Sequence, residues 1–171
     1  MTDICCIGHI TRDRIITQDP PMTTHCAGGS AYYMAWAFQA LPHDVDFHMI
    51  TSVSRELMPE VNRLCEAGIK VTAYESPTNV FFENKYGANM DHRTQRVLAK
   101  SAPFTLRQLE CEEARVFHLG TLLADDFTPK TVDPQADEES FKLAITRLWN
   151  KTKVHVDWSR PVDYVKAHPR Y

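Results

Sequence analysis

Two short motifs near the N-terminus carry groups that could bind a polar ligand. Gly28-Gly29-Ser30 stands directly before an apolar segment that runs to Leu41. Paired glycines allow backbone angles and close approaches that any side chain would block, and Ser30 can cap a helix by accepting a backbone N–H. Free N–H groups and the positive end of the helix dipole would then face the ligand. The pair alone also fits a tight turn that binds nothing, because short glycine motifs match by chance often.

The second motif follows the first expected strand. Residues 3–10 predict a buried strand that reaches Gly8, and Asp13 comes shortly after it. A strand that ends in glycine and leads into polar groups is typical of the ligand-facing edge of an open α/β sheet. Asp13 could accept hydrogen bonds from ligand hydroxyls. Alternatively, it is a solvated loop carboxylate paired with Arg12 or Arg14.

The elements that would position these motifs alternate between strand and helix. The apolar segment after Gly29 predicts a helix, and so does the segment from Pro59 to Gly68, with proline in its first turn and glycine past its end. Such alternation predicts a parallel sheet with helices on its faces. The expected core strands are 3–10, 45–53, 69–74, 116–120 and 153–156, and the remaining expected helices are 105–114 and 137–149.

One region breaks this alternation. Residues 79–86 and 93–99 predict two strands joined by a turn, which is a hairpin rather than a helix-linked pair. With a short strand at 14–17, the hairpin could form a small separate sheet, built from about 12–25 and 76–100. An isolated hairpin is marginal in water, so this sheet would be a lid or a dimer contact. The alternative is an irregular surface excursion.

Composition narrows the class of protein. A chain of 171 residues with 43% apolar and 24% charged residues predicts one soluble globular domain, 1–171. The net charge of −3 and the absence of a basic stripe predict no nucleic-acid partner. No apolar run is long enough to span a membrane and no signal peptide is evident, so we expect a cytoplasmic protein. The cysteines and histidines lack metal-ligand spacing, so we expect no metal site.

Taken in order, these features resemble a known family. Gly8 to Asp13, Gly28-Gly29, the hairpin, Val116–Gly120 and Asp157-x-x-Arg160-Pro161 are similar to the N-terminal half of a PfkB (ribokinase-like) sugar or nucleoside kinase. The resemblance implies a three-layer α/β/α, Rossmann-like core with a small β-sheet lid, truncated at its C-terminal side. It also implies a sugar or nucleoside as the small-molecule partner, and a possible homodimer through the lid.

The resemblance also assigns residues. The residues that it implies for substrate binding are Thr11, Asp13, Gly28, Gly29 and Tyr33. Thr11 stands where the family often has Asn, and Tyr33 stands where many members have Asn after the glycine pair. Asp157 and Arg160 are further possible site residues in the last element, where Trp158-Ser159 replaces the usual Pro-Asn.

The family's catalytic half has no counterpart in the sequence. The family binds the transferring phosphoryl group with the glycine amides of a late Gly-Ala-Gly-Asp turn, whose Asp is the base. The present sequence has six glycines and none after Gly120, and the family's Asn-x-x-Glu element is also absent. No catalytic residue is therefore assigned. ATP and Mg²⁺ are expected for the full-length family but have no site here, and we predict that this chain alone has no kinase turnover.

Three functions are compatible with these observations. The first is a phosphotransferase to an alcohol group, shortened and inactive alone. The second is a non-catalytic module that binds a sugar or nucleoside, or that assembles with another chain through the lid. The third is an unrelated Rossmann-type nucleotide binder. Against this function, the sequence has no GxGxxG after the first strand and no P-loop.

Overall fold

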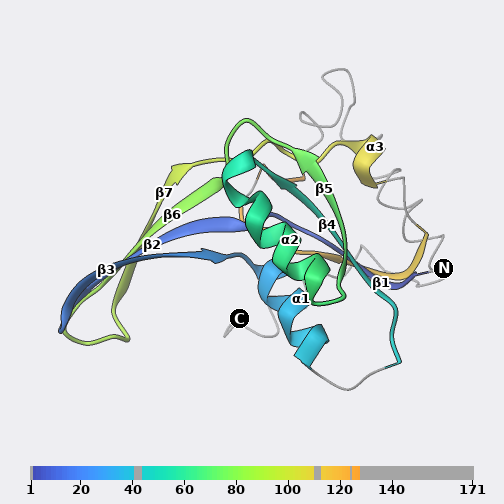
Figure 1. Cartoon of the computed structure of the whole chain (residues 1–171). Coiled ribbons are helices and arrows are strands. Elements are labelled where there is room, and N and C mark those ends of the chain that lie inside the picture. Colours follow the sequence, from blue (N-terminus) through green and yellow to red (C-terminus); the bar gives the residue numbers. More distant parts are fainter. Residues whose placement is uncertain (1, 41–43, 110–112, 124, 128–171) are drawn as a thin grey trace, which may run out of the picture.

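The computed structural model describes residues 2–40, 44–109, 113–123 and 125–127, which form two four-stranded sheets (Figure 1). The first, called the core sheet, has the strand order β5-β4-β1-β8, and all its neighbouring strands are parallel. Its strands are β1 (Thr2–Ile7), β4 (Phe47–Val53), β5 (Lys70–Glu75) and β8 (Ala114–Leu119). The predicted α/β class with a parallel sheet is confirmed.

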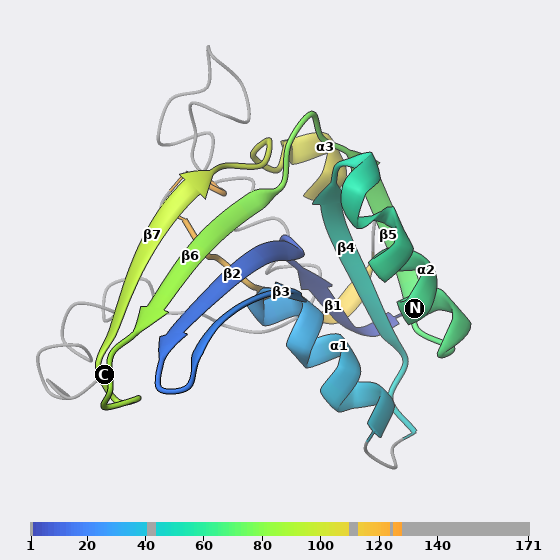
Figure 2. The ribbon, with the colours of Figure 1, turned by 60° about the vertical axis from the view of Figure 1, so that its left-hand side comes forward.

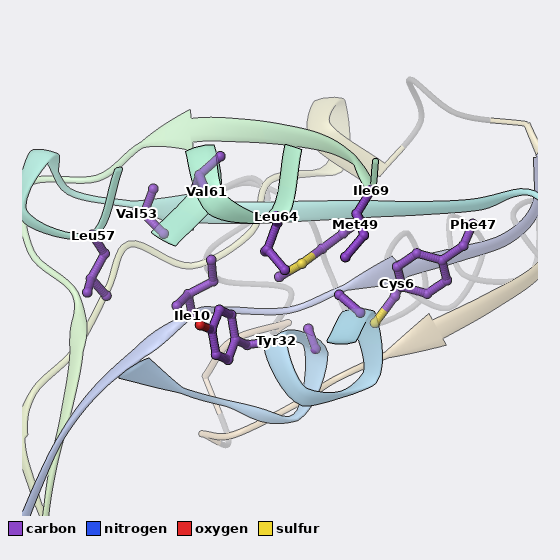
Figure 3. Close-up of a cluster of buried hydrophobic side chains, with 12 residues drawn as sticks. Cys6, Ile10, Tyr32, Phe47, Met49, Val53, Leu57, Val61, Leu64 and Ile69 are labelled. Carbon is purple, nitrogen blue, oxygen red and sulfur yellow. The ribbon is translucent and has the colours of Figure 1, made fainter. Parts of the chain in front are cut away.

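The central strands of the core sheet, β1 and β4, carry buried side chains on both faces. Helices α1 (Ser30–Ala40) and α2 (Met58–Glu66) pack on one face, and the turn η1 (Arg55–Leu57) leads into α2. The side chains buried on this face are Cys6, Ile10, Ala31, Tyr32, Ala35, Phe47, Met49, Val53, Leu57, Val61, Leu64 and Ile69 (Figure 3). Those buried on the opposite face are Cys5, Ile7, Ile50, Phe104 and Ala114. Successive residues of β1 and β4 thus point to opposite faces, as the pleat of a strand requires.

The second sheet, called the lid, has the strand order β3-β2-β6-β7 and extends away from the core (Figure 1 and Figure 2). Its strands are β2 (Thr11–Gln18), β3 (Pro21–Gly28), β6 (Val80–Tyr86) and β7 (Arg93–Ala99). β2 pairs with β3 and β6 pairs with β7 as antiparallel hairpins, whereas β2 and β6 are parallel. The predicted hairpin and the predicted separate sheet are therefore confirmed.

Two local predictions are wrong, and others lie outside the described residues. The expected short strand at 14–17 with a proline-stopped turn is in fact a full hairpin, because Pro21 begins the edge strand β3, where its missing N–H costs no ladder bond. The expected helix 105–114 is shorter, since α3 (Leu106–Leu109) is followed by β8, which begins at Ala114. The predicted helix 137–149, strand 153–156 and the residues Asp157 and Arg160 lie outside the described residues.

Helix α1 also differs from its prediction. We expected an all-round buried helix capped by Ser30, but the helix begins at Ser30 itself. The carbonyl of Gly29 accepts the first bond, from the Tyr33 N–H at 3.1 Å, so Gly29 holds the cap position. Only one face is buried, and Tyr33 is 58% exposed. Among the described helices, none has the length and apolar character needed to cross a bilayer.

Candidate ligand-binding site

The two sequence motifs meet where the core sheet joins the lid. After β1 the chain passes through Gly8, His9 and Ile10 into β2, and β3 returns to this point before α1 begins. Thr11 lies opposite Gly28 across the β2–β3 hairpin, and Asp13 lies opposite Cys26. The structure therefore brings Thr11 and Asp13 next to the glycine pair.

Each glycine of the pair is required for a different reason. A Cβ on Gly28 would stand 2.8 Å from Asp13 Oδ2 and 2.9 Å from Thr11 Oγ1. Gly29 has φ +103, and its Cβ would stand 2.4 Å from the His9 carbonyl oxygen. Gly28 thus leaves room for a carboxylate, whereas Gly29 permits the turn itself. The pair is a tight turn, and a half-buried carboxylate stands against it.

Asp13 is a strand residue that shares a face with Thr11. Thr11 Oγ1 donates a hydrogen bond to Asp13 Oδ1 at 2.8 Å, and no described residue bonds to Oδ2. The two flanking arginines point away: Arg12 pairs with Glu56 at 2.8 Å, and Arg14 pairs with Glu83. The interpretation of Asp13 as a loop carboxylate paired with Arg12 or Arg14 is therefore wrong, because alternation along β2 separates them.

The environment of Asp13 disfavours its charge. Partial burial raises the pKa of Asp13, and the Thr11 hydrogen bond and the positive charge of Arg93 offset this only in part. Partial burial likewise raises the pKa of Tyr33, with Cys26, Asp13 and Tyr86 adding to the effect. The phenol of Tyr33 therefore lies in the same electrostatic environment as the Asp13 carboxylate. Residues of α1, β2, β3, β6 and β7 are thus close enough here to influence one another's charge.

Three of these residues were not found from the sequence: Cys26, Tyr86 and Arg93. Tyr86 and Arg93 pair across the β6–β7 hairpin. Their relation to each other could have been predicted from the hairpin, since partners across a turn share a face. Their relation to Asp13 depends on the pairing of β2 with β6, which are distant in the sequence.

The opposite face of the lid is held by a cluster around Glu83, which is 3% exposed. Arg14 donates to the Glu83 carboxylate, Lys85 Nζ lies 3.3 Å from it and Arg96 Nη1 lies 3.8 Å from it. The Arg14 hydrogen bond is the main reason why the pKa of Glu83 is lowered. Because Arg14, Glu83 and Arg96 belong to β2, β6 and β7, the cluster fixes the register of these strands.

A buried histidine supports the site from the core side. His9 Nδ1 lies 3.3 Å from the Ser52 carbonyl oxygen, its Nε2 lies 3.5 Å from Asp126 Oδ1, and its ring stacks on Phe104 at 4.4 Å. The other oxygen of Asp126 accepts N–H bonds from Leu122 and Leu123. Burial lowers the pKa of His9 despite Asp126, whose charge these N–H groups already compensate. The ring thus fixes the backbone whose carbonyl faces Gly29.

The remaining predicted site residues are placed as follows. Tyr33 lies in the first turn of α1 and faces the site, and Asp157 and Arg160 lie outside the described residues. Within the described part of the chain, no three His, Cys, Asp or Glu side chains are grouped so as to hold a metal ion. The site is therefore built from hydroxyls, phenols, one carboxylate and one guanidinium.

Comparison with solved protein structures identifies proteins with a similar fold. No protein-family model matches the sequence, and no curated protein sequence does. Solved structures do match. A pyrophosphate-dependent kinase in the ribokinase family, complexed with a pyrophosphate analog and myo-inositol, is 23% identical with a TM-score of 0.60, and the match covers 75% of this chain and 43% of that one.

Two other kinases show the same likeness. Ribokinase from Giardia lamblia is 11% identical with a TM-score of 0.63, and the match covers 88% of this chain and 48% of that one. A nucleoside kinase from Burkholderia thailandensis in complex with inosine is 14% identical with a TM-score of 0.52, over 67% of this chain and 43% of that one. The matched region is less than half the length of these kinases. The chain has a ribokinase-like fold, as the sequence motifs implied.

Proposed function

We propose that this chain is the substrate-binding region of a ribokinase-type kinase and that it binds a polyhydroxylated small molecule. The observation that carries the proposal is Asp13, whose carboxylate stands against Gly28 with one oxygen free of described partners. Carboxylate oxygens accept hydrogen bonds from hydroxyls strongly, because the acceptor is charged. The fold supports the proposal, since two of the similar kinases were solved with myo-inositol and with inosine.

In this proposal each residue of the site binds or orients the substrate. Thr11 holds the Asp13 carboxylate in one orientation, and Gly28 leaves the space in which a hydroxyl can approach it. Tyr33 provides a partly exposed ring at the opening of the site. Thr11, Asp13 and Gly28 belong to the lid strands β2 and β3, and the partial burial of Asp13 would strengthen its polar contacts with a substrate.

Turnover requires more than substrate binding. Phosphoryl transfer needs a donor site, groups that stabilise the transferring phosphoryl group and a base for the attacking hydroxyl. The sequence holds no Gly-Ala-Gly-Asp turn. We therefore propose that the 171-residue chain alone binds its substrate without phosphorylating it, which is also what a non-catalytic binding module would do.

A thermal-shift experiment tests this proposal. The purified chain would be screened with myo-inositol, ribose and inosine, each with and without ATP–Mg²⁺, because a ligand that binds the native state raises the apparent Tm. We expect at least one polyol to raise the Tm, no further rise with ATP–Mg²⁺, and loss of the shift in D13N. The control is D125N, which removes an exposed carboxylate that pairs with Lys100.

Each arm has an outcome that contradicts the proposal. An equal polyol shift in D13N would show that the site lies elsewhere. ATP-dependent phosphorylation of a polyol by the chain would overturn the claim that it binds without turnover.

The lid also offers a surface for a second copy, and we propose that the chain forms a homodimer through the lid. Its edge strand β3 is exposed for most of its length, with Met22 55% exposed. Unpaired strand edges pair readily with other strands. Light scattering during gel filtration would show a dimer for the wild type and a monomer for M22K. A wild-type monomer, or a dimer that M22K leaves intact, would contradict this contact.

A further inference from the structure

The inner face of the lid carries a positive charge that the binding of neutral hydroxyls does not use. Asp13 pairs with Phe82 across β2 and β6, and Tyr86 pairs with Arg93 across β6 and β7. Because alternate residues of a strand share a face, Tyr86 lies on the face of Phe82, and Arg93 therefore lies on the face of Asp13. The Asn84–Gln95 hydrogen bond of 2.9 Å, on the same face, supports this register.

Arg93 differs from the other cations of the lid strands. Those cations all lie on the opposite face and contact a carboxylate: Arg12 contacts Glu56, and Arg14, Lys85 and Arg96 contact Glu83. Arg93 forms no ion pair with any described residue and is exposed. It is close enough to Asp13 to lower the pKa of that carboxyl, but without direct contact.

One phenol stands opposite this guanidinium, and a second lies near that phenol. Tyr86 is the cross-strand partner of Arg93, and Tyr33 of helix α1 is near enough to Tyr86 and Asp13 for both to raise its pKa. Phenolic O–H groups donate hydrogen bonds, and a guanidinium donates in a planar fork that matches a carboxylate or a phosphate. This part of the inner face therefore offers donors to an anion, whereas Asp13 offers an acceptor to hydroxyls.

The two parts are separated along the lid. Tyr86 lies four positions beyond Phe82 on β6, which corresponds to about 13 Å between their backbones. The long side chain of Arg93 shortens the gap between its guanidinium and Asp13. A single ligand could thus place hydroxyls at Asp13 and an anionic group nearer the lid turn, where repulsion from Asp13 is weaker.

We propose that the substrate is a polyol that also carries an anionic group, a carboxylate or a phosphate, and that Arg93 with Tyr86 binds this group. This rests on the proposed function, in which Asp13 and Thr11 bind the hydroxyls. The substrate class is then sugar acids or sugar phosphates rather than neutral sugars or nucleosides. Arg93 is in this account a specificity-determining residue that contacts the substrate.

Titration calorimetry of the whole chain with matched ligand pairs tests the proposal. The pairs are sorbitol with gluconate, and ribose with ribose 5-phosphate, so that the carboxylate and phosphate arms are separate. We expect one anionic ligand to bind at least about tenfold more tightly than its neutral partner, as one charge-assisted contact of about 1.5 kcal/mol implies. Higher salt should reduce this preference.

Variants of the same strand provide the control. R93Q should lower the affinity for the anionic ligand to that of the neutral one and leave neutral binding intact, which also shows that the variant is folded. R93K should keep part of the preference, because an ammonium binds as a point charge without the fork. R96Q removes the same charge from the opposite face of β7 and should keep the full preference.

The failure of this inference differs from the failure of the proposed function. Equal binding of both members of each pair by the wild type, or an anion preference that R93Q retains, would overturn the role of Arg93 while polyol binding stands. Absence of binding by all four ligands would overturn the proposed function, and this inference with it.

Discussion

The core sheet and the lid are built from strands of similar length, but they are stabilised in different ways. Every residue of β4 is buried, and β1 is buried on both faces by helices on one side and by Phe104 on the other. In the lid, most of β3 and β7 is exposed. The lid is held by the Glu83 cluster and by its connections to the core rather than by a buried core of its own.

This difference shows where a ligand site can form. Hydrophobic burial stabilises the core independently of any ligand, so changes of its buried residues lower stability. The lid keeps polar groups on its inner face, including Asp13 and Arg93, which packing does not require. The site lies at the junction of the two sheets, where rigid turns from the core hold side chains of the lid.

Gly29→Ala should have the largest effect, because it breaks the junction. The Cβ would meet the His9 carbonyl at 2.4 Å, in a backbone conformation with φ +103. We expect a loss of about 3–5 kcal/mol in the free energy of unfolding, measured by urea denaturation. Gly68→Ala is the control, since Gly68 has φ +88 but no atom within 4 Å, and should cost only about 1 kcal/mol. Equal losses of unfolding free energy in the two variants would show that the left-handed backbone conformation alone, and not the contact with His9, causes the destabilisation.

Truncation of an apolar side chain should cost more stability in the core sheet than in the lid. Leu64 is fully buried between α2 and the core sheet, so Leu64→Ala should cost about 2–5 kcal/mol in unfolding free energy. Val97 of the lid is 44% exposed, and Val97→Ala should cost less than about 1 kcal/mol. A large loss for Val97→Ala would show that the lid has a core of its own.

His9 should make stability depend on pH. Burial holds the pKa of His9 below 6.5 in the folded state, so the unfolded chain binds a proton first as the pH falls. Stability is therefore full above about pH 6.5 and decreases below it, by at most about 1.4 kcal/mol per pH unit for one proton. Denaturation curves at pH 7.5, 6.0 and 5.0 should show a steeper decrease for the wild type than for H9Q. If the stability of the wild type and of H9Q decreased equally with pH, His9 would take up a proton in the folded state as readily as in the unfolded chain.

Asp13→Asn should have the smallest effect on stability, and in the opposite direction. Burial raises the pKa of Asp13 above 3.8, so the carboxylate destabilises the folded state once the pH exceeds that range. The amide removes the charge and can still accept the Thr11 hydrogen bond. At pH 7 the variant should therefore be as stable as the wild type or slightly more stable. A clearly lower Tm would show that Asp13 stabilises the fold instead of serving a ligand.

The sequence predicted the core better than the lid, for physical reasons. Runs such as 3–10 and 45–53 are apolar, and the helices between them require parallel pairing. β3 was missed because residues 21–25 begin with a proline and lack the alternation of apolar and polar residues that usually marks a half-buried strand. The junction could be predicted only as two separate motifs. Arg93 was not found, because its position near Asp13 depends on the register of β2 and β6, which pair across a long separation in the sequence.

Amide chemical-shift mapping of the whole chain is the most direct test of the central claim that the junction of core and lid binds a polyol. The chain would be titrated with myo-inositol and with gluconate while the backbone amide signals are followed. We predict saturable shifts with at least one ligand, largest at residues 11–13 and 28–33, with no change at Gly68. Shifts that concentrate on α2 and β5, or no saturable shift with either ligand, would contradict the account.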